Sequence, residues 1–286
     1  MKVLIFGQTG QVAQELARCA PDDIVPHFLS RHDADLLDPE ACAKVIAGAQ
    51  VDAVINAAAW TAVDRAETEE AVATIVNGHA PGAMAQACAS ANLPFIHIST
   101  DYVFDGTGDA PFTPDYPPQP VSAYGRSKLA GEDAIRQSSA RHLILRTSWV
   151  VSAHGANFIK TMLRLGAQRD ALNVVSDQIG GPTPAASIAT ALYSIAYQMV
   201  DGQSGGTYHF SGLPDTSWAD FARTIMTEAD LDCQIRDIPT EDYPTPATRP
   251  LNSRLDCSTL RRDFGIERPD WQRELKHIIK DLGANT

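Results

Sequence analysis

A strand, a glycine turn and a helix follow one another at the start of the chain, and this succession restricts the possible folds more than any other feature. The apolar residues 3–6 run directly into Gly7, and Gly10 and Ala13 follow at intervals of three before a helical pattern begins. This is the context in which a dinucleotide fingerprint operates. Glycine lets backbone amides approach a pyrophosphate, and a helix N-terminus favours its negative charge. The spacing is Gly-x-x-Gly-x-x-Ala rather than Gly-x-Gly-x-x-Gly, so a plain tight turn is the alternative to a nucleotide site.

Strand-like and helical segments then alternate to about residue 150. The predicted strands cover residues 3–6, 24–29, 51–55, 95–98 and 143–146. Such alternation is typical of an α/β protein with a Rossmann-like, doubly wound parallel sheet. Beyond residue 170 turn-rich and proline-rich segments become frequent. We therefore predict an NAD(P)-binding Rossmann domain over residues 1–170. Residues 171–286 are predicted to be mainly a smaller substrate-binding region, with some elements returning to the Rossmann domain.

The charge and the cysteines exclude several classes of partner and site. The formal net charge is −12, which argues against nucleic acid or an anionic membrane as a partner, since both select basic surfaces. No apolar run reaches membrane-spanning length. The apolar residues at the start of the sequence are too few for a signal-peptide core. The 5 cysteines are scattered without a Cys-x-x-Cys pair, which favours reduced thiols and a cytoplasmic location over disulfides or zinc.

Three residues are candidates for proton transfer to a carbonyl oxygen. Thr100 lies just past the predicted strand 95–98, where open α/β sheets place their ligands. Tyr124 and Lys128 are four residues apart at the head of a helical run, so both side chains share one helix face. A phenol titrates near pH ~10, and we expect a close ammonium to favour its ionised form. The alternative is that Tyr-x-x-x-Lys occurs by chance on a helix face.

The end of the second predicted strand bears on cofactor choice. A carboxylate at this position binds the ribose 2′-hydroxyl of NAD, but Ser30 and Arg31 stand there instead. Arg31 is suited to a 2′-phosphate, which favours NADPH and leaves NADH possible. A solvated loop charge is the alternative for Arg31.

Four further polar or aromatic residues have structural as well as functional interpretations. Asn77 falls in a predicted alanine-rich helix over residues 69–91, where we expect it on a solvated face. Trp149 follows the strand 143–146 and is suited either to the core or to stacking on a flat ligand. Arg249 and Arg254 are candidates for phosphate contacts in an otherwise acidic chain.

Several motifs in order carry a resemblance to a known family over nearly the whole chain. They are Gly-Gln-Thr-Gly-Gln at 7–11, Asn-Ala-Ala-Ala-Trp-Thr-Ala-Val-Asp at 56–64, Ser-Thr-Asp-Tyr-Val-Phe-Asp-Gly at 99–106, Tyr-Gly-Arg-Ser-Lys at 124–128, Arg-Thr-Ser-Trp-Val at 146–150, Gly-Pro-Thr at 181–183 and Arg-Pro at 249–250. The chain resembles the dTDP-4-dehydrorhamnose reductases of the extended short-chain dehydrogenase/reductase superfamily.

The resemblance implies a role for each matching residue. Tyr124 would be the general acid, Lys128 its activator and a ribose ligand, and Thr100 a hydrogen-bond partner of the sugar carbonyl. Asp101, Tyr102, Trp149 and Arg249 would bind the substrate. The cofactor would be held by Gly7, Gly10, Gln11 and Val12 at the pyrophosphate, by Arg31, Asp35 and Leu36 at the adenosine, and by Ala59, Trp60, Thr61, Tyr124 and Lys128 at the nicotinamide half.

The implied reaction is hydride transfer from NADPH, or NADH, to C4 of a dTDP-linked 4-keto-6-deoxyhexose, giving dTDP-L-rhamnose for lipopolysaccharide or cell-wall polysaccharide. Some family members dimerise around a Mg²⁺ held by a glutamate of the first helix and an acidic pair after the Gly-x-Pro-Thr segment. Glu15 is present, but Ala185 and Ala186 replace the acidic pair. We therefore expect no metal site and a monomer or weak homodimer.

Two other hypotheses about the function compete with the reductase assignment. One is another nucleotide-sugar 4-ketoreductase, an epimerase or a 4,6-dehydratase on the same fold. Dehydratases place a glutamate after the Thr-Asp pair, whereas this chain has Tyr102. The other is a non-catalytic regulatory subunit like that of methionine adenosyltransferase, which keeps the fold and the nucleotide loop; retention of Thr100, Tyr124 and Lys128 favours an enzyme.

Overall fold

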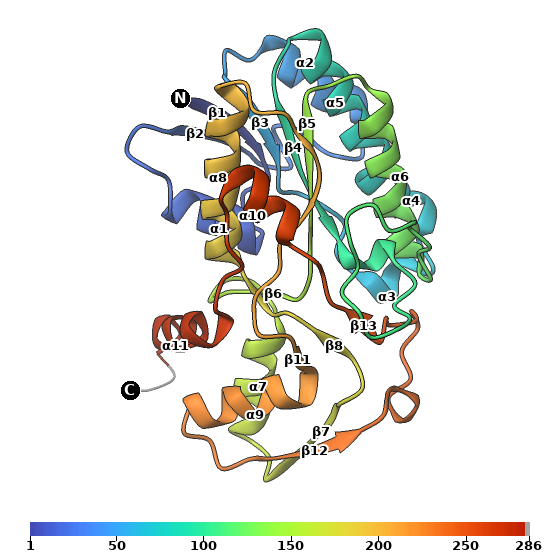
Figure 1. Ribbon diagram of the computed structural model, residues 1–286, viewed down its shortest axis with the longest axis vertical. Coiled ribbons are helices and arrows are strands. Elements are labelled where there is room, and N and C mark those ends of the chain that lie inside the picture. Colours follow the sequence, from blue (N-terminus) through green and yellow to red (C-terminus); the bar gives the residue numbers. More distant parts are fainter. Residues whose placement is uncertain (284–286) are drawn as a thin grey trace.

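A six-stranded parallel sheet forms the centre of the computed structural model, which describes residues 1–283 (Figure 1). In spatial order its strands are β2 (Val25–Leu29), β1 (Lys2–Phe6), β3 (Ala53–Asn56), β4 (Phe95–Thr100), β5 (His142–Thr147) and β10 (Gly206–His209). Every neighbouring pair is parallel. The predicted Rossmann-like α/β class is confirmed. The chain moves outward in opposite directions from β1 and β3, so the switch in strand order lies between them, where such sheets bind ligands.

Both faces of the sheet are covered by helices, which explains why its strands are continuously apolar. On β1, Val3 and Ile5 belong to the core beneath α1 (Gln11–Arg18) and α8 (Ala185–Val200). Leu4 and Phe6 belong to the opposite core, beneath α2 (Pro39–Gly48), α5 (Ala80–Ser90) and α6 (Ala123–Gln137).

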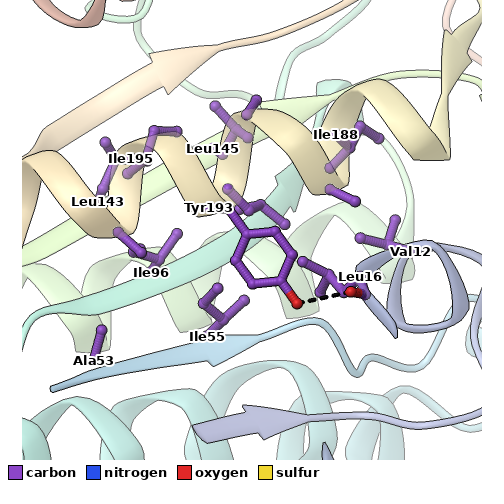
Figure 2. Close-up of a cluster of buried hydrophobic side chains, with 14 of the residues drawn as sticks. Val12, Leu16, Ala53, Ile55, Ile96, Leu143, Leu145, Ile188, Tyr193 and Ile195 are labelled. Carbon is purple, nitrogen blue, oxygen red and sulfur yellow. Dashed lines mark hydrogen bonds between the residues drawn. The ribbon is translucent and has the colours of Figure 1, made fainter. Parts of the chain in front are cut away.

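One buried tyrosine joins the two helices of the first layer. Tyr193 of α8 is 2% exposed and lies among Val12, Ile55 and Leu145 (Figure 2). Its hydroxyl donates a hydrogen bond to the Leu16 carbonyl of α1 at 2.7 Å. A buried tyrosine usually finds such a partner, and this one ties the helix after the glycine turn to the core.

A smaller lobe lies beyond the carboxyl edge of the sheet (Figure 1). Its core lies between α7 (Phe158–Gly166), β7 (Ala171–Val175), α9 (Trp218–Glu228), β12 (Gln234–Ile238) and α11 (Trp271–Asp281). Short pairings add β6 (Val150–Val151) with β9 (Thr183–Pro184), and β11 (Thr216–Ser217) and β13 (Asn252–Ser253) with β8 (Ile179–Gly180). From the chain after residue 170, α8, β10 and α10 (Ser258–Phe264) pack with the central sheet. A division at residue 170 stays a prediction.

The predicted helix over residues 69–91 contains a wide turn that the sequence pattern did not indicate. It consists of α4 (Glu70–Thr74), the π-helical segment η1 (Ile75–His79) and α5. Asn77 in η1 is 1% exposed, so the expectation of a solvated face was wrong. The reason is close packing on α6, where a Cβ on Gly131 would lie 2.1 Å from the Asn77 carbonyl oxygen. π-Helical turns of this kind are frequent at functional sites.

The cysteines of residues 1–283 are unpaired, and all but the half-buried Cys19 are buried. Burial raises the pKa of Cys42 to about 11 and that of Cys88 to about 12, which marks these two thiols as packing groups rather than nucleophiles. None of the helices described is both long enough and apolar enough to cross a membrane.

Candidate active site

A cleft of about 1060 Å³ opens at the carboxyl ends of β1, β3, β4 and β5. Of the residues predicted from the sequence, those that line it are Gly7, Gly10, Gln11, Val12, Arg31, Asp35, Leu36, Ala59, Trp60, Thr61, Thr100, Asp101, Tyr102, Tyr124, Lys128 and Trp149. Arg249 is not among the lining residues. The fold therefore brings together side chains that are separated by more than a hundred positions in the sequence.

The glycine turn forms one end of the cleft. Gly7 has φ +113°, and a Cβ there would lie 3.3 Å from the Ala57 carbonyl carbon, so only glycine fits without strain. Gly10 is the N-cap of α1 and provides no side-chain cap, while a Cβ on it would meet nothing within 4 Å. The first amides of α1 thus face open space, as at an anion-binding helix N-terminus.

The side chain of Gln11 is committed to the protein itself. Its Nε2 donates to the Val150 carbonyl at 3.3 Å, and its Oε1 accepts from Ser152 Oγ and Asn157 Nδ2, both at 2.9 Å. These bonds fasten the glycine turn to the loop after β6. A ligand at this end of the cleft therefore meets the backbone of Gln11 rather than its amide side chain.

Arg31 lies at the mouth of the cleft with its side chain 72% exposed. Its Nε lies 3.1 Å from Asp35 Oδ2. The Leu37 N–H, donated to Asp35 Oδ1, and the Arg31 side chain both lower the pKa of Asp35. An exposed guanidinium in this position is free to turn toward an anionic group, because an exposed pair of this kind contributes about 0–1 kcal/mol.

Thr100 and Asp101 form a buried pair at the end of β4. Thr100 Oγ1 donates to Asp101 Oδ1 at 3.0 Å and accepts from the Tyr102 N–H at 3.2 Å. Asp101 is 3% exposed. Burial raises its pKa to about 6, while hydrogen bonds from Ser253 and Thr100 oppose the rise. The Asp101 carboxyl therefore binds a proton at a higher pH than an exposed aspartate does.

Tyr124 is held in its protonated form. Its ring packs edge-on against Tyr102 with 5.5 Å between centroids. Burial raises the pKa of the Tyr124 phenol, a hydrogen bond with Thr100 opposes the rise, and Asp101 adds to it. The expected lowering of the Tyr124 pKa by a neighbouring ammonium is wrong, because the Lys128 amine is bound to β4. A neutral phenol is the form that can donate a proton.

The amine of Lys128 is bound to two groups of β4, and one of them was missed by the sequence reasoning. Nζ donates to the Ile98 carbonyl at 2.7 Å and lies 3.0 Å from His97 Nε2. His97 Nδ1 in turn lies 3.1 Å from Asn56 Nδ2. All three side chains are buried. The signal available in the sequence was a histidine within an otherwise apolar strand, since a buried polar group needs a partner.

Asn77 braces the loop that carries the predicted nicotinamide-side residues. Its Oδ1 accepts from the Trp60 N–H at 2.8 Å, and its Nδ2 donates to the Trp60 carbonyl at 3.0 Å. The same Nδ2 donates to Ser127 Oγ at 3.0 Å. One buried amide thus positions both the backbone of Trp60 and the turn of α6 that bears Lys128.

Trp149 is half-buried and lines the cleft. Its ring stacks on Trp218 of α9 with 3.6 Å between centroids and 13° between planes. Its backbone is left-handed, with φ +48°, a conformation uncommon outside glycine and asparagine. A Cβ on Gly180 would lie 2.9 Å from its ring. The smaller lobe therefore sets the position of this wall of the cleft.

Arg249 does not line the cleft, but it is hydrogen-bonded to Tyr102, which does. Its Nη1 donates to the Tyr102 hydroxyl at 3.3 Å, and its Nη2 lies 2.7 Å from Asp64 Oδ2. Arg254 donates instead to Asn252 Oδ1 at 3.1 Å. Both arginines thus have protein partners in this state, and neither lines the cleft.

A buried ion pair joins β5 to α6. Arg146 of β5 donates to Glu132 of α6 through Nε at 2.9 Å and Nη2 at 2.6 Å. The Ser99 hydroxyl donates to the same carboxylate at 2.6 Å, as does Arg136. Burial alone would raise the pKa of Glu132, but Arg146 and Ser99 together lower it. This pair joins β4, β5 and α6 directly beside Thr100.

Glu15, the one expected ligand of a shared magnesium ion that this chain retains, contacts two neighbouring side chains. Glu15 is 4% exposed, with Oε2 2.7 Å from Arg18 and Oε1 3.3 Å from His154 Nε2. Ala185 at the start of α8 is buried. Within residues 1–283, no three side chains of histidine, cysteine, aspartate or glutamate converge as a metal site requires.

The fold and the cleft place this chain in the class of Rossmann-type oxidoreductases that use a nicotinamide cofactor. Comparison with known proteins narrows the class. Residues 1–284 match the family model described as the RmlD substrate binding domain, and the chain belongs to that family. It is 42% identical over 98% of its length to dTDP-4-dehydrorhamnose reductase of Sinorhizobium fredii, of which it covers 97%.

Solved structures agree with this assignment. The crystal structure of a dTDP-4-dehydrorhamnose reductase from Clostridium acetobutylicum superposes with a TM-score of 0.93 at 34% identity, covering 99% of this chain and all of the other. That of the Bacillus anthracis enzyme in complex with NADP gives a TM-score of 0.90 at 31% identity, over 98% and 99% of the two chains.

The raised pKa of Asp101 predicts a pH-dependent effect of Asp101→Asn on stability. A carboxyl whose folded pKa is about 6 contributes its full share of stability below the ordinary value of 3.8 and loses it as the pH rises through 6. We expect the variant to exceed the wild type by about 2–3 kcal/mol in free energy of unfolding at pH 7.5, and by much less at pH 4.5. Urea denaturation at both pH values measures this. Asp109→Asn, in an exposed loop, is the control. A difference independent of pH would contradict the assignment.

Proposed function

We propose that this protein reduces the C4 keto group of dTDP-4-dehydro-L-rhamnose to dTDP-L-rhamnose, with NADPH as the preferred reductant and NADH possible. The observation that carries the proposal is the convergence of Thr100, Tyr124 and Lys128 beside the glycine turn. They do so in a chain whose full-length relatives bear this enzyme's name. The cofactor preference is supported by the relative crystallised with NADP and by Arg31 at the mouth of the cleft.

The cofactor half of the cleft runs from the glycine turn to the loop after β3. The amides of Gly10, Gln11 and Val12 at the start of α1 hold the pyrophosphate, and Gly7 allows its close approach. Arg31 pairs with the ribose 2′-phosphate, which requires it to exchange Asp35 for the ligand. Further contacts come from Asp35 and Leu36 at the adenine and from Ala59, Trp60 and Thr61 at the nicotinamide.

The substrate half is formed by Asp101 and Tyr102 of η2 (Asp101–Val103) and by Trp149. Thr100 donates a hydrogen bond to the C4 carbonyl oxygen in place of its present bond to Asp101. Asp101 then accepts from a sugar hydroxyl, and Trp149 bounds the sugar. Arg249 supports Tyr102 from the far side and supplies positive charge toward the diphosphate of an anionic substrate.

The reduced nicotinamide supplies the hydride, and Tyr124 supplies the proton. Because the pKa of the Tyr124 phenol is raised by burial, the group carries its proton at neutral pH and can donate it to the alkoxide oxygen formed at C4. Thr100, hydrogen-bonded to the same oxygen, stabilises the developing negative charge. Lys128 stabilises the phenolate that Tyr124 becomes, which requires its ammonium to exchange a partner on β4 for the phenolate.

The proposal extends to the setting of the reaction. The protein acts in the cytoplasm as a monomer or weak homodimer, without nucleic acid or membrane as a partner, and without a bridging Mg²⁺. The engagement of Glu15 by Arg18 and His154 supports the last point.

The central test is oxidation of NADPH in the presence of dTDP-4-dehydro-L-rhamnose. Wild type turns over, and Tyr124→Phe loses about 10²–10⁴-fold in kcat while still binding NADPH, because only the proton donor is removed. Tyr243→Phe, 59% exposed, is the matched control and leaves kcat unchanged. Cofactor binding without oxidation by this or any related keto sugar would refute the enzyme and favour a regulatory subunit.

Cofactor preference is tested at Arg31. Arg31→Ala raises the KM for NADPH about tenfold and leaves that for NADH unchanged, since a charge-assisted hydrogen bond to phosphate is lost. Arg236→Ala, an exposed arginine on β12, serves as the control. Equal effects on both cofactors would show that Arg31 does not meet the 2′-phosphate.

The absence of a bridging metal is tested by chelation. After prolonged EDTA treatment and gel filtration, kcat and the molar mass from light scattering are expected to equal those before treatment. Loss of mass or activity that Mg²⁺ restores would contradict the proposal.

A further inference from the structure

The side chains of Asn56, His97 and Lys128 form a buried hydrogen-bonded chain beneath the cleft, and the proposed reaction so far uses only the last of them. Asn56 is 0% exposed, and His97 and Lys128 are each 1% exposed. They come from β3, β4 and α6, so tertiary structure alone brings them together. Because water is excluded, each donor must meet an acceptor within the chain itself.

The backbone determines the orientation of the Asn56 amide. The Ala58 N–H donates to Asn56 Oδ1 at 3.1 Å. This leaves Asn56 Nδ2, which is only a donor, facing His97 Nδ1 at 3.1 Å. The reverse orientation would set the Ala58 N–H against an NH₂ group, donor against donor. His97 Nδ1 is therefore an acceptor.

The tautomer of His97 follows from this. Burial and the neighbouring Lys128 lower the pKa of the His97 imidazole well below its ordinary value, so the ring is neutral. A neutral imidazole carries one N–H, and with Nδ1 accepting, the hydrogen is on Nε2. That nitrogen lies 3.0 Å from Lys128 Nζ. If Lys128 is a neutral amine, the His97 Nε2–H can donate a hydrogen bond to the lone pair on Nζ. If Lys128 is an ammonium, the same N–H faces the hydrogens on Nζ and is repelled by them.

We propose that His97 is a positioning residue of the reaction: oriented by Asn56, it holds the Lys128 amine through its Nε2–H and lowers the proton affinity of that amine in the cofactor-free protein. The Ile98 carbonyl holds the same nitrogen from a second side at 2.7 Å. The consequence for catalysis rests on the proposed function, whereas the tautomer can be measured whatever the substrate is.

The other ionisable groups around this end of the cleft are Tyr124 and Glu132 on α6, Asp101 on η2 and Arg146 on β5, which pairs with Glu132. The η1 segment that packs on α6 presents the uncharged Asn77 to Ser127. Burial lowers the pKa of Lys128 to about 8, and Glu132 opposes the shift. The His97 N–H acts in the same direction as burial. If the ammonium is the active form, kcat/KM falls as the pH rises through the Lys128 pKa.

The first test reads the tautomer directly by ¹⁵N NMR of histidine-labelled protein at pH 9 without cofactor. The His97 ring, assigned through bonds from its backbone amide, is expected to carry hydrogen on Nε2. Asn56→Asp, nearly isosteric, presents an acceptor to Nδ1 and moves the hydrogen to Nδ1. A wild-type His97 ring that is protonated on Nδ1, or on both nitrogens, would overturn the proposal. This outcome is read from the wild-type protein alone and does not depend on the folding of a variant.

The second test is the pH profile of kcat/KM for NADPH-dependent reduction. In His97→Gln an amide oxygen accepts from the ammonium, so the alkaline limb moves up by about one pH unit. His27→Gln, exposed on β2, leaves the limb unchanged. A limb that stays in place or moves down in a His97→Gln protein of wild-type thermal stability overturns the proposal. If no keto sugar is reduced but His97 carries its hydrogen on Nε2, the proposed function is refuted. The proposed hydrogen bonds between Asn56, His97 and Lys128 are then still supported.

Discussion

The bidentate pair between Glu132 and Arg146 is the interaction on which the geometry of the cleft depends. It is buried at both ends, and the Ser99 hydroxyl completes the carboxylate's hydrogen bonds. Removing one partner of such a pair leaves an uncompensated buried charge, which costs about 3–5 kcal/mol. Because Ser99 precedes Thr100 and Glu132 lies one turn beyond Lys128, the same contact holds β4 and α6 at a fixed separation. The proposed proton donor and the carbonyl-binding hydroxyl belong to those two elements.

Close backbone contacts complete this arrangement. A Cβ on Gly125 would lie 2.2 Å from the Tyr102 carbonyl oxygen, so α6 rests directly on the segment after Thr100. Gly131 makes the comparable approach to η1, where Asn77 positions Trp60. Helix α6 is therefore placed by close packing against η2 and η1, and Tyr124 and Lys128 are placed with it.

Burial shifts Tyr124 and Lys128 in opposite directions along the pH scale. The phenol is kept protonated, and the amine loses part of its affinity for a proton, because a low dielectric disfavours the charged form of each. The two groups do not form a pair, since the lysine is bound to β4. A binding event that changes the contacts of Lys128 would therefore change the proton balance of the site.

Local sequence patterns were enough to predict the sheet and the glycine turn. The first five strands of the sheet along the chain, the helix bearing Tyr124 and Lys128, and the place of Thr100 follow from local periodicity, because buried strands are continuously apolar and a glycine turn between a strand and a helix has few alternatives. The motif resemblance added the residue roles. The partners of Asn77, Arg249 and Lys128, in contrast, are set by contacts across the fold. Their interactions join residues between 17 and 185 positions apart. Such partners, and the pKa shifts that burial produces, depend on distances across the fold, and hydrophobic periodicity within one segment carries no information about those distances.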